Sequence, residues 1–262
     1  MRFDAPRPVR NHFTGGILSN DQATALHITV VPDSKRLSLE NLSQLTRLPD
    51  LKQAIINFVA SQTTEVATCM SYFTSIDVWH KFRVQLHSNF QSSVIMPSQV
   101  VQARPPGDLF PHGNCDVVLL DSSRQSRNPY TIAQVRTVFK PHLTPSMVQD
   151  LRFSFLLTPL LYVQYFKVCQ EDPSTRMWMV ERCLTETERG TVRIGEVIPL
   201  MCISHAAELV AVYGEKANRA ISSYTSQECY SRFFLNHYAD KEVYNALHGK
   251  VDEDFFYRPD IQ

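Results

Sequence analysis

The residues best suited to nucleophilic chemistry are Cys115 and His112, which lie close together in the segment FPHGNCD. A histidine that removes the thiol proton makes cysteine a strong nucleophile, so this pair would serve a hydrolase. Immediate neighbours in sequence seldom form such a pair, and a turn that leads into a strand explains Gly113, Asn114 and Asp116 equally well. A Cys/His hydrolase is therefore the weakest of the functional alternatives.

Metal and cofactor chemistry has little support among the other polar residues. His205 and Glu208 are spaced i, i+3 and would share one helix face as metal ligands, but no second pair supplies the remaining ligands. The six cysteines lie far apart without a C-x-x-C motif, so a zinc site of paired cysteines is not indicated. Motifs typical of phosphate, dinucleotide, zinc-protease and serine-hydrolase sites are missing. We therefore expect no metal, no cofactor and no enzymatic activity.

Aromatic and basic residues offer a different kind of site. Tyr162, Tyr165 and Trp178 lie on strands that we expect to be neighbours, and outward-facing rings there would form a cage for a methylated lysine through cation–π contacts. The alternative is that these rings fill the interior of the fold. Arg124 and Arg127 share one polar loop and are candidate phosphate contacts, although a solvated loop explains them as well.

Alternating apolar and polar residues predict the strands that must hold these side chains. Between Val78 and Leu86 the residues alternate in a way that is typical of a half-buried strand. One face has Val78, His80, Phe82, Val84 and Leu86, and the other has Trp79, Lys81, Arg83 and Gln85. Turn-forming Pro, Asn and Asp residues separate further apolar stretches. These stretches predict strands over Leu26–Val31, Val94–Ala103, Asp116–Asp121, Tyr130–Phe139, Leu160–Val168, Met177–Leu184, Glu196–Leu200 and Glu208–Tyr213, and aromatic residues return at Cys229–His237.

Helix signals lie near both ends of the chain. Ser38 is suited to cap a short helix and Asp50 to start a second one, which gives the N-terminal third an α-on-β character. Asp240 is suited to cap a final helix over Lys241–His248. The residues expected on the inward face of that helix are Val243, Tyr244 and Leu247.

The pattern of elements predicts an α+β fold. Many short strands with turns between them indicate mainly an antiparallel β-barrel or a bent sheet. We expect a smaller α/β part on the N-terminal side and a helix at the C-terminal end. The expected divisions are a flexible arm at residues 1–20, the α/β part at 21–110, the barrel part at 111–250 and a tail at 251–262.

Composition and charge limit the partners. Of the 262 residues 44% are hydrophobic, and Lys+Arg 26 balance Asp+Glu 26. This excludes a disordered chain and argues against binding nucleic acid through many phosphates. The longest apolar region, Phe153–Phe166, is interrupted by polar residues and is too short to span a membrane. Because the N-terminus lacks the apolar segment of a secretory signal, we expect a nuclear or cytoplasmic location and no membrane partner.

Eight strings in a fixed order carry a resemblance to a known family. Their order resembles the C-terminal region of proteins encoded by fungal transposons, the Plavaka-type elements of basidiomycetes, and the resemblance covers roughly Ala25 to His248. The resemblance implies that a DDE-type catalytic core lies upstream in the parent protein, so no DDE residue is assigned to this chain. The strings are LPDLKQAIINFV, DVWHKFRVQL, VIMPSQVVQARPPGD, CDVVLLD, YTIAQVRTVFKP, LLYVQYFK, VIPLMCI and CYSRFFLNHYADKEVYNALH.

Within that region, Cys115 to about Leu247 is similar in plan to a BAH-like module. Such modules are interaction domains of chromatin proteins, which implies a BAH-like β-barrel and a protein or chromatin partner. We therefore expect a non-enzymatic protein-interaction or chromatin-associated module that derives from a transposon-encoded protein. The alternative is a DNA-binding accessory domain of a transposase, which the zero net charge disfavours.

Overall fold

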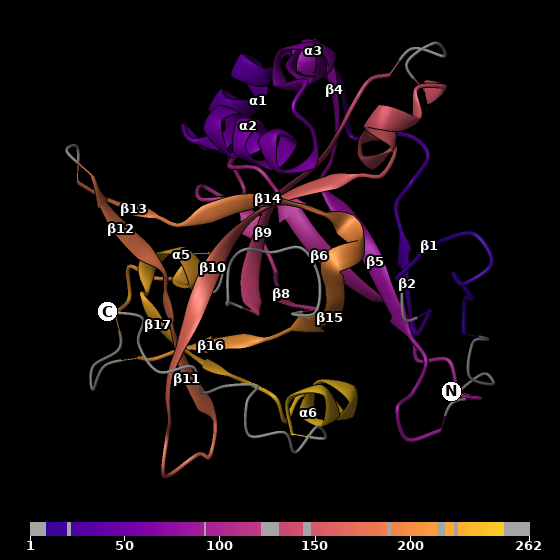
Figure 1. Cartoon of the computed structure of the whole chain (residues 1–262). Coiled ribbons are helices and arrows are strands. Elements are labelled where there is room, and N and C mark those ends of the chain that lie inside the picture. Colours follow the sequence, from indigo (N-terminus) through magenta and orange to yellow (C-terminus); the bar gives the residue numbers. More distant parts are fainter. Residues whose placement is uncertain are drawn as a thin grey trace.

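The computed structural model describes residues 9–19, 22–91, 93–121, 131–143, 148–187, 190–213, 218–222 and 225–248. Its strands form two main sheets, and a group of helices lies on one side of the larger sheet (Figure 1). Three parts of the chain named above lie outside the described residues: the beginning of the expected arm, the loop with Arg124 and Arg127, and the tail at 251–262. The phosphate contacts at the two arginines therefore stay a prediction.

The larger sheet has ten strands and is antiparallel at every pairing between described strands. Its longest strand, β10 (Leu160–Glu171), pairs with β9 (Ile132–Pro141), β11 (Trp178–Arg182) and β14 (Gly195–Pro199). The described strands form an open sheet and not a closed barrel. The other strands are β15 (Ile203–Ala207), β8 (Val117–Leu120), β17 (Arg232–Leu235), β16 (Leu209–Ala211), β4 (Ile76–Trp79) and β3 (Ser34–Leu37).

The smaller sheet has five described strands in the order β1-β2-β5-β6-β7, and a separate hairpin pairs β12 with β13. Both are antiparallel, so the α+β class with mainly antiparallel strands is confirmed. The bounds of these strands are β1 (Ile17–Leu18), β2 (Thr24–His27), β5 (Lys81–Leu86), β6 (Gln99–Arg104), β7 (Asn114–Cys115), β12 (Leu184–Thr187) and β13 (Gly190–Arg193).

The strand expected from Val78 to Leu86 is two strands, because the chain changes sheets at His80. β4 pairs within the larger sheet, whereas β5 pairs within the smaller sheet. At the break the backbone N–H of His80 donates to the Asp33 carboxylate, 2.8 Å away, and not to a neighbouring strand. One segment therefore links both sheets, and strands from before and after residue 110 share the larger sheet.

Helices α1 (Leu39–Thr46), α2 (Leu51–Gln62) and α3 (Val66–Met70) pack together over β14, as Figure 1 shows. Ser38 caps α1 as expected, since its hydroxyl oxygen accepts the Asn41 backbone N–H at 3.1 Å. Ile55 of α2 and Val197 of β14 belong to one hydrophobic cluster. Burial of this apolar face holds the helical layer on the sheet. Short 3-10 turns follow at η1 (Ser71–Thr74), η2 (Leu151–Leu156) and η3 (Leu200–Cys202).

The C-terminal helix α6 (Lys241–His248) has the bounds that the sequence predicts. Val243 and Leu247 are buried in a cluster with Phe233 of β17. Tyr244 was expected on the same face, but it is 43% exposed, because an i, i+4 pair already fills the narrow buried stripe of so short a helix. None of the described helices is long and apolar enough to cross a membrane.

Residues 9–19, expected to be part of a flexible arm, are packed on the smaller sheet. The His12 backbone N–H donates to Gln85 Oε1 at 2.7 Å, and Gln85 Nε2 donates to the Arg10 carbonyl at 2.7 Å. β1 then pairs with β2 at the edge of the sheet. A buried glutamine on β5 thus satisfies the backbone of a segment that has no hydrophobic periodicity of its own.

Candidate functional site

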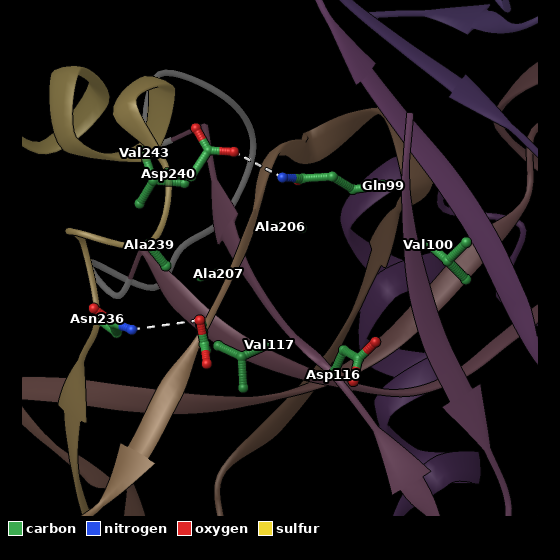
Figure 2. Close-up of a pocket in the computed structure, with 11 residues that line it drawn as sticks. Gln99, Val100, Asp116, Val117, Ala206, Ala207, Asn236, Ala239, Asp240 and Val243 are labelled. Atoms are coloured by element: carbon green, nitrogen blue, oxygen red, sulfur yellow. Dashed lines mark hydrogen bonds between the residues drawn. The ribbon is translucent and has the colours of Figure 1, made fainter. Parts of the chain in front are cut away.

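A pocket of about 290 Å³ opens where the smaller sheet, the larger sheet and the start of α6 meet (Figure 2). One wall comes from β6, a second from β8 and β15, and a third from the segment that joins β17 to α6. Small and apolar side chains form much of the lining between the polar groups. The lining residues are Gln99, Val100, Asp116, Val117, Ala206, Ala207, Glu208, Asn236, Ala239, Asp240 and Val243.

Three carboxylates, those of Asp116, Glu208 and Asp240, give the pocket its electrostatic character. Among the described residues that line it, none is a lysine, arginine or histidine. The other polar lining groups are the amides of Gln99 and Asn236. The pocket therefore presents three negative charges without a positive lining residue, which suits a cationic ligand.

Asp116, which connects β7 to β8, is held by two hydrogen bonds to the backbone of Gln102 on β6. Its Oδ2 atom accepts the Gln102 backbone N–H at 2.8 Å, and its own backbone N–H donates to the Gln102 carbonyl at 2.9 Å. Burial raises the pKa of Asp116, although the bond from Gln102 acts in the opposite direction. Its negative charge is thus poorly solvated, and a cation in the pocket would stabilise it.

Asp240 links the pocket to both the smaller sheet and α6. Its Oδ2 atom accepts a hydrogen bond from Gln99 Nε2 at 2.7 Å, as Figure 2 shows. Its Oδ1 atom accepts the Glu242 backbone N–H at 2.7 Å, which confirms the expected capping role. Earlier in the same segment, Asn236 Nδ2 donates to Glu208 Oε2 at 3.4 Å. Glu208 itself is exposed, so its carboxylate can turn toward a ligand.

A buried carboxylate anchors α6 and thereby fixes the third wall. Glu242 is fully buried, and its Oε1 atom accepts the Ser88 hydroxyl at 2.6 Å. Its Oε2 atom accepts the Asn89 backbone N–H at 2.8 Å. Both partners follow β5, so the start of α6 is tied to the smaller sheet. The pocket is therefore preformed by polar contacts between segments about 150 residues apart.

Five aromatic rings form a cluster around the start and the exposed side of α6: Trp178, His237, Tyr238, Tyr244 and His248. The two tyrosine rings are stacked with centroids 6.0 Å apart, and both are exposed, Tyr238 by 57% and Tyr244 by 43%. His237 and His248 have centroids 4.7 Å apart, and Trp178 meets His248 edge to face at 6.2 Å. Exposed aromatic rings of this kind are enriched in protein interfaces.

Two of the aromatic residues expected to contact a partner lie inside the fold. Tyr162 and Tyr165 are at most 1% exposed, because β10 is covered by the helices on one face and by the smaller sheet on the other. The Tyr162 hydroxyl donates to Asp50, and the Tyr165 hydroxyl donates to Glu196 Oε2 at 2.9 Å. The cage expected from outward-facing rings therefore does not form at these two positions. Of the three, Trp178 alone is only partly buried.

The pair that suggested a hydrolase does not come together. His112 is exposed, whereas Cys115 is buried and its Sγ atom faces the carbonyls of Arg104 and Arg136 at 3.6 and 3.8 Å. Burial raises the pKa of Cys115 to about 12, so its thiol stays protonated at neutral pH. A buried thiol of this kind is not an activated nucleophile.

The suggested metal ligands are separated as well. His205 lies on strand β15 and Glu208 follows that strand, so the i, i+3 spacing no longer places both on one helix face. Within the described residues, no group of three or more His, Cys, Asp and Glu side chains is arranged to hold a metal ion.

Sequence reasoning did not identify the pocket, because each of its carboxylates has a local explanation. Asp116 reads as part of a turn, Asp240 as a helix cap and Glu208 as a strand end. Their convergence depends on how two sheets meet, which leaves no spacing signal. One weak indication of the aromatic cluster lies in the sequence: Tyr244 and His248 are one helical turn apart in the predicted helix, so their rings are expected to be neighbours.

Fold and site together define a mainly antiparallel α+β protein with a carboxylate-lined pocket at the junction of two sheets. The chain belongs to the DUF6830 family, a domain of unknown function, whose family model matches residues 3–180. That range contains the pocket residues up to Val117, whereas the walls from β15 and α6 lie beyond it. Neither the curated proteins nor the solved structures gave a match.

Proposed function

We propose that the chain is a non-enzymatic protein-interaction module that receives a basic side chain of a partner protein in the carboxylate-lined pocket. The observation that carries this proposal is the charge of the pocket: three carboxylates line it, and no described basic residue of the chain does. A positive charge on the partner would be attracted by these carboxylates, and the complex would form without rearrangement because the pocket already exists.

Lysine is the side chain that fits this environment. Its ammonium group has three donors, which matches acceptors on Asp116, Glu208 and Asp240. Its four-carbon stem would lie against the small and apolar lining, which includes Ala206 and Val243. The exposed rings of Tyr238 and Tyr244 flank the same chain segment and would contact neighbouring residues of the partner.

The same charge disfavours the alternative, a DNA-binding accessory domain. Phosphates would be repelled by the three carboxylates, and the chain has no excess of positive charge with which to release counterions from DNA. A gel-shift experiment at about 150 mM salt tests this alternative, because bulk phosphate binding at that salt needs several basic contacts. A stable complex with duplex DNA would favour it over the protein partner.

The biological setting of the module rests on the resemblance to Plavaka-type transposon proteins. In this proposal the module derives from a transposon-encoded protein, its open antiparallel sheet is a variant of the BAH-like plan, and it acts in the nucleus or cytoplasm. Lysine-rich tails of chromatin proteins are the class of partner that suits both the setting and the acidic pocket.

Calorimetric titration tests the proposed function. The ligands are a lysine-rich peptide and the same peptide with norleucine in place of lysine, which keeps the length and removes the charge. We expect the chain to bind the first peptide and not the second. The Glu208→Gln and Asp240→Asn variants should each bind roughly tenfold more weakly, equal to about 1.4 kcal/mol.

The matched control is Glu40→Gln, since Glu40 is an exposed carboxylate of α1 away from the pocket lining. It should bind like the wild type. Equal binding of both peptides, or no effect of the two pocket variants, would contradict the proposal.

A further inference from the structure

Three arginine side chains surround Glu228 in a mostly buried cluster on the larger sheet. Arg136 Nη1 lies 2.9 Å from Glu228 Oε1, Arg193 Nη1 lies 2.5 Å from Oε2, and Arg182 Nη2 lies 3.8 Å from Oε1. The side chains of Arg136, Arg182 and Glu228 are at most 10% exposed. We call these three arginines the arginine cluster. They come from β9, β11 and β13, so only the folded chain assembles them.

The arginine cluster carries more positive charge than Glu228 can neutralise. Among the described residues, three positive charges against one negative charge leave two in excess. The carboxylate's other polar contact within the described residues is neutral, since Gln134 Nε2 donates to Glu228 Oε1 at 2.8 Å. The nearby Cys115 thiol is protonated because burial raises its pKa to about 12. Arg136 also keeps a buried Nε atom that has no hydrogen-bond partner in the part of the chain that the structure describes. The cluster thus retains capacity for a further negative charge.

Glu228 belongs to a segment that is attached mainly by these charges. It lies on α5 (Ser226–Cys229), a four-residue helix whose one apolar residue, Cys229, is exposed. The arginines also bind the backbone of this segment: Arg182 Nη2 donates to the Gln227 carbonyl at 2.5 Å, and Arg193 Nη2 donates to the Glu228 carbonyl at 3.4 Å. Because little apolar surface is buried here, electrostatic contacts hold α5 on the sheet.

We propose that the arginine cluster is an anion-binding site in which Glu228 is an intramolecular occupant, and that a phosphate monoester competes with Glu228 for this site. A phosphate monoester carries close to two negative charges at neutral pH, so in place of Glu228 it would neutralise two of the three arginine charges instead of one. Guanidinium groups bind phosphate oxygens through paired, charge-assisted hydrogen bonds.

The geometry of Arg182 supports this assignment. Its guanidinium lies 5.0 Å from the ring centre of Phe166 and 5.4 Å from that of Phe233, which fixes its plane. Its Nη1 atom donates to Gln134 Oε1 at 3.0 Å. Because the two rings and Gln134 already fix the Arg182 side chain, little conformational entropy is lost when one bound anion replaces another. The site would therefore persist when α5 is displaced.

Removal of the internal carboxylate tests the proposal. The occupied site lowers the apparent affinity for any competing anion, so Glu228→Gln should bind inorganic phosphate and a phosphoserine peptide at least about tenfold more tightly than the wild type does. Titrations are run against chloride at equal ionic strength. Glu186→Gln, which changes an exposed carboxylate of β12, is the matched control and should behave like the wild type.

Preference between the two ligands identifies the source of the phosphate: tighter binding of the phosphoserine peptide indicates a phosphoprotein, and tighter binding of inorganic phosphate indicates the free ion. An oligonucleotide without terminal phosphates carries only diesters. Equal affinity of the Glu228→Gln variant for this oligonucleotide would overturn the proposal, and so would an unchanged affinity for both monoesters in the folded variant.

If the variant does not fold, hydrogen exchange on the wild-type chain gives the answer. Phosphate should make the amides of Ser226–Cys229 exchange faster than chloride does at the same ionic strength, because α5 is displaced. Amides of the central strand β10 should not respond in this way. Unchanged or slower exchange at α5 in phosphate would overturn the proposal.

Discussion

Glu228 Oε1 lies 2.9 Å from Arg136 Nη1, although 92 positions separate the two residues in the chain. The contact joins α5 to a central strand of the larger sheet. Both side chains are at most 10% exposed, so each charge depends on the other for its stabilisation. Removal of one partner from a buried pair leaves an uncompensated charge and is strongly destabilising, whereas the intact pair adds little beyond a hydrophobic pair of equal volume.

The first prediction concerns acid unfolding. Burial alone would raise the pKa of Glu228, but Arg136, Arg182 and Arg193 outweigh it and lower the pKa to about 2, from an ordinary value of 4.5. The stability that this carboxylate provides is therefore present above pH 4.5 and is lost as the pH falls toward 2. The full difference corresponds to about 3 kcal/mol.

Urea unfolding of the wild type and Glu228→Gln measures this effect. The difference in their free energies of unfolding should be constant near neutral pH and should shrink below pH 4.5. A difference that stays the same down to about pH 3 would show that the carboxylate is not stabilised by the arginines.

The second prediction concerns His237. The residue is 1% exposed, and neither ring nitrogen has a hydrogen-bond partner among the described residues. Burial and the neighbouring His248 lower the pKa of His237, while Glu171 acts in the opposite direction. Because the folded pKa lies below the ordinary 6.5, the stability that depends on a neutral ring is present above that pH and is lost as the pH falls toward the folded value.

His237→Phe keeps an aromatic ring in the cluster and removes the titration. The wild type should lose more unfolding free energy than this variant between about pH 7.5 and pH 5.5. His12 and His80 also have lowered pKa values, so only the difference between wild type and variant reports His237. Equal losses in both proteins would count against the effect.

The third prediction tests the buried position of Tyr162. Gly195 lies on β14 directly beneath the Tyr162 ring, and an added methyl group would meet both the ring and its hydroxyl. Gly195→Ala should destabilise the chain by about 1–3 kcal/mol, as overpacking does. Gly107→Ala, where nothing lies within 4 Å, should change stability by less than about 0.5 kcal/mol. Thermal unfolding distinguishes the two, and equal effects would argue for an outward-facing Tyr162.

The fourth prediction concerns the anchor of α6. Ser88→Ala removes the hydroxyl that donates to the buried Glu242 carboxylate. Loss of a hydrogen bond to a charged group should cost about 1.5–3 kcal/mol, measured by urea unfolding. Ser93→Ala, at an exposed position of the same loop, is the control and should be nearly neutral. If Ser88→Ala lowered the free energy of unfolding no more than Ser93→Ala does, Glu242 would not anchor the helix.

Local signals accounted for the elements that the sequence predicted well. Asp240 caps α6, and the bounds of that helix agree with the expectation. Ser38 caps α1 in the same way. A cap needs only residues within one turn, so it can be identified without knowledge of the fold. Long stretches rich in β-branched and aromatic residues, such as those of β9 and β10, are also visible locally.

Contacts between distant residues explain what the sequence could not predict. The break at His80 depends on Asp33, 47 positions earlier, and burial of the Tyr162 hydroxyl depends on Asp50, 112 positions earlier. Alternation identifies two faces of a strand but does not say whether both are covered. The pocket depends on the meeting of two sheets, and no periodicity encodes the approach of Asp116 to Asp240.

Nuclear magnetic resonance of the labelled chain is the most direct test of the proposed lysine-binding pocket. Titration with a lysine-rich peptide should shift the amide signals of Gln99, Asn236 and Asp240, while signals of α1 and α2 stay in place. The norleucine analogue should cause no such shifts, because the pocket recognises the charge. Shifts confined to residues away from the pocket, or equal shifts with both peptides, would contradict the account.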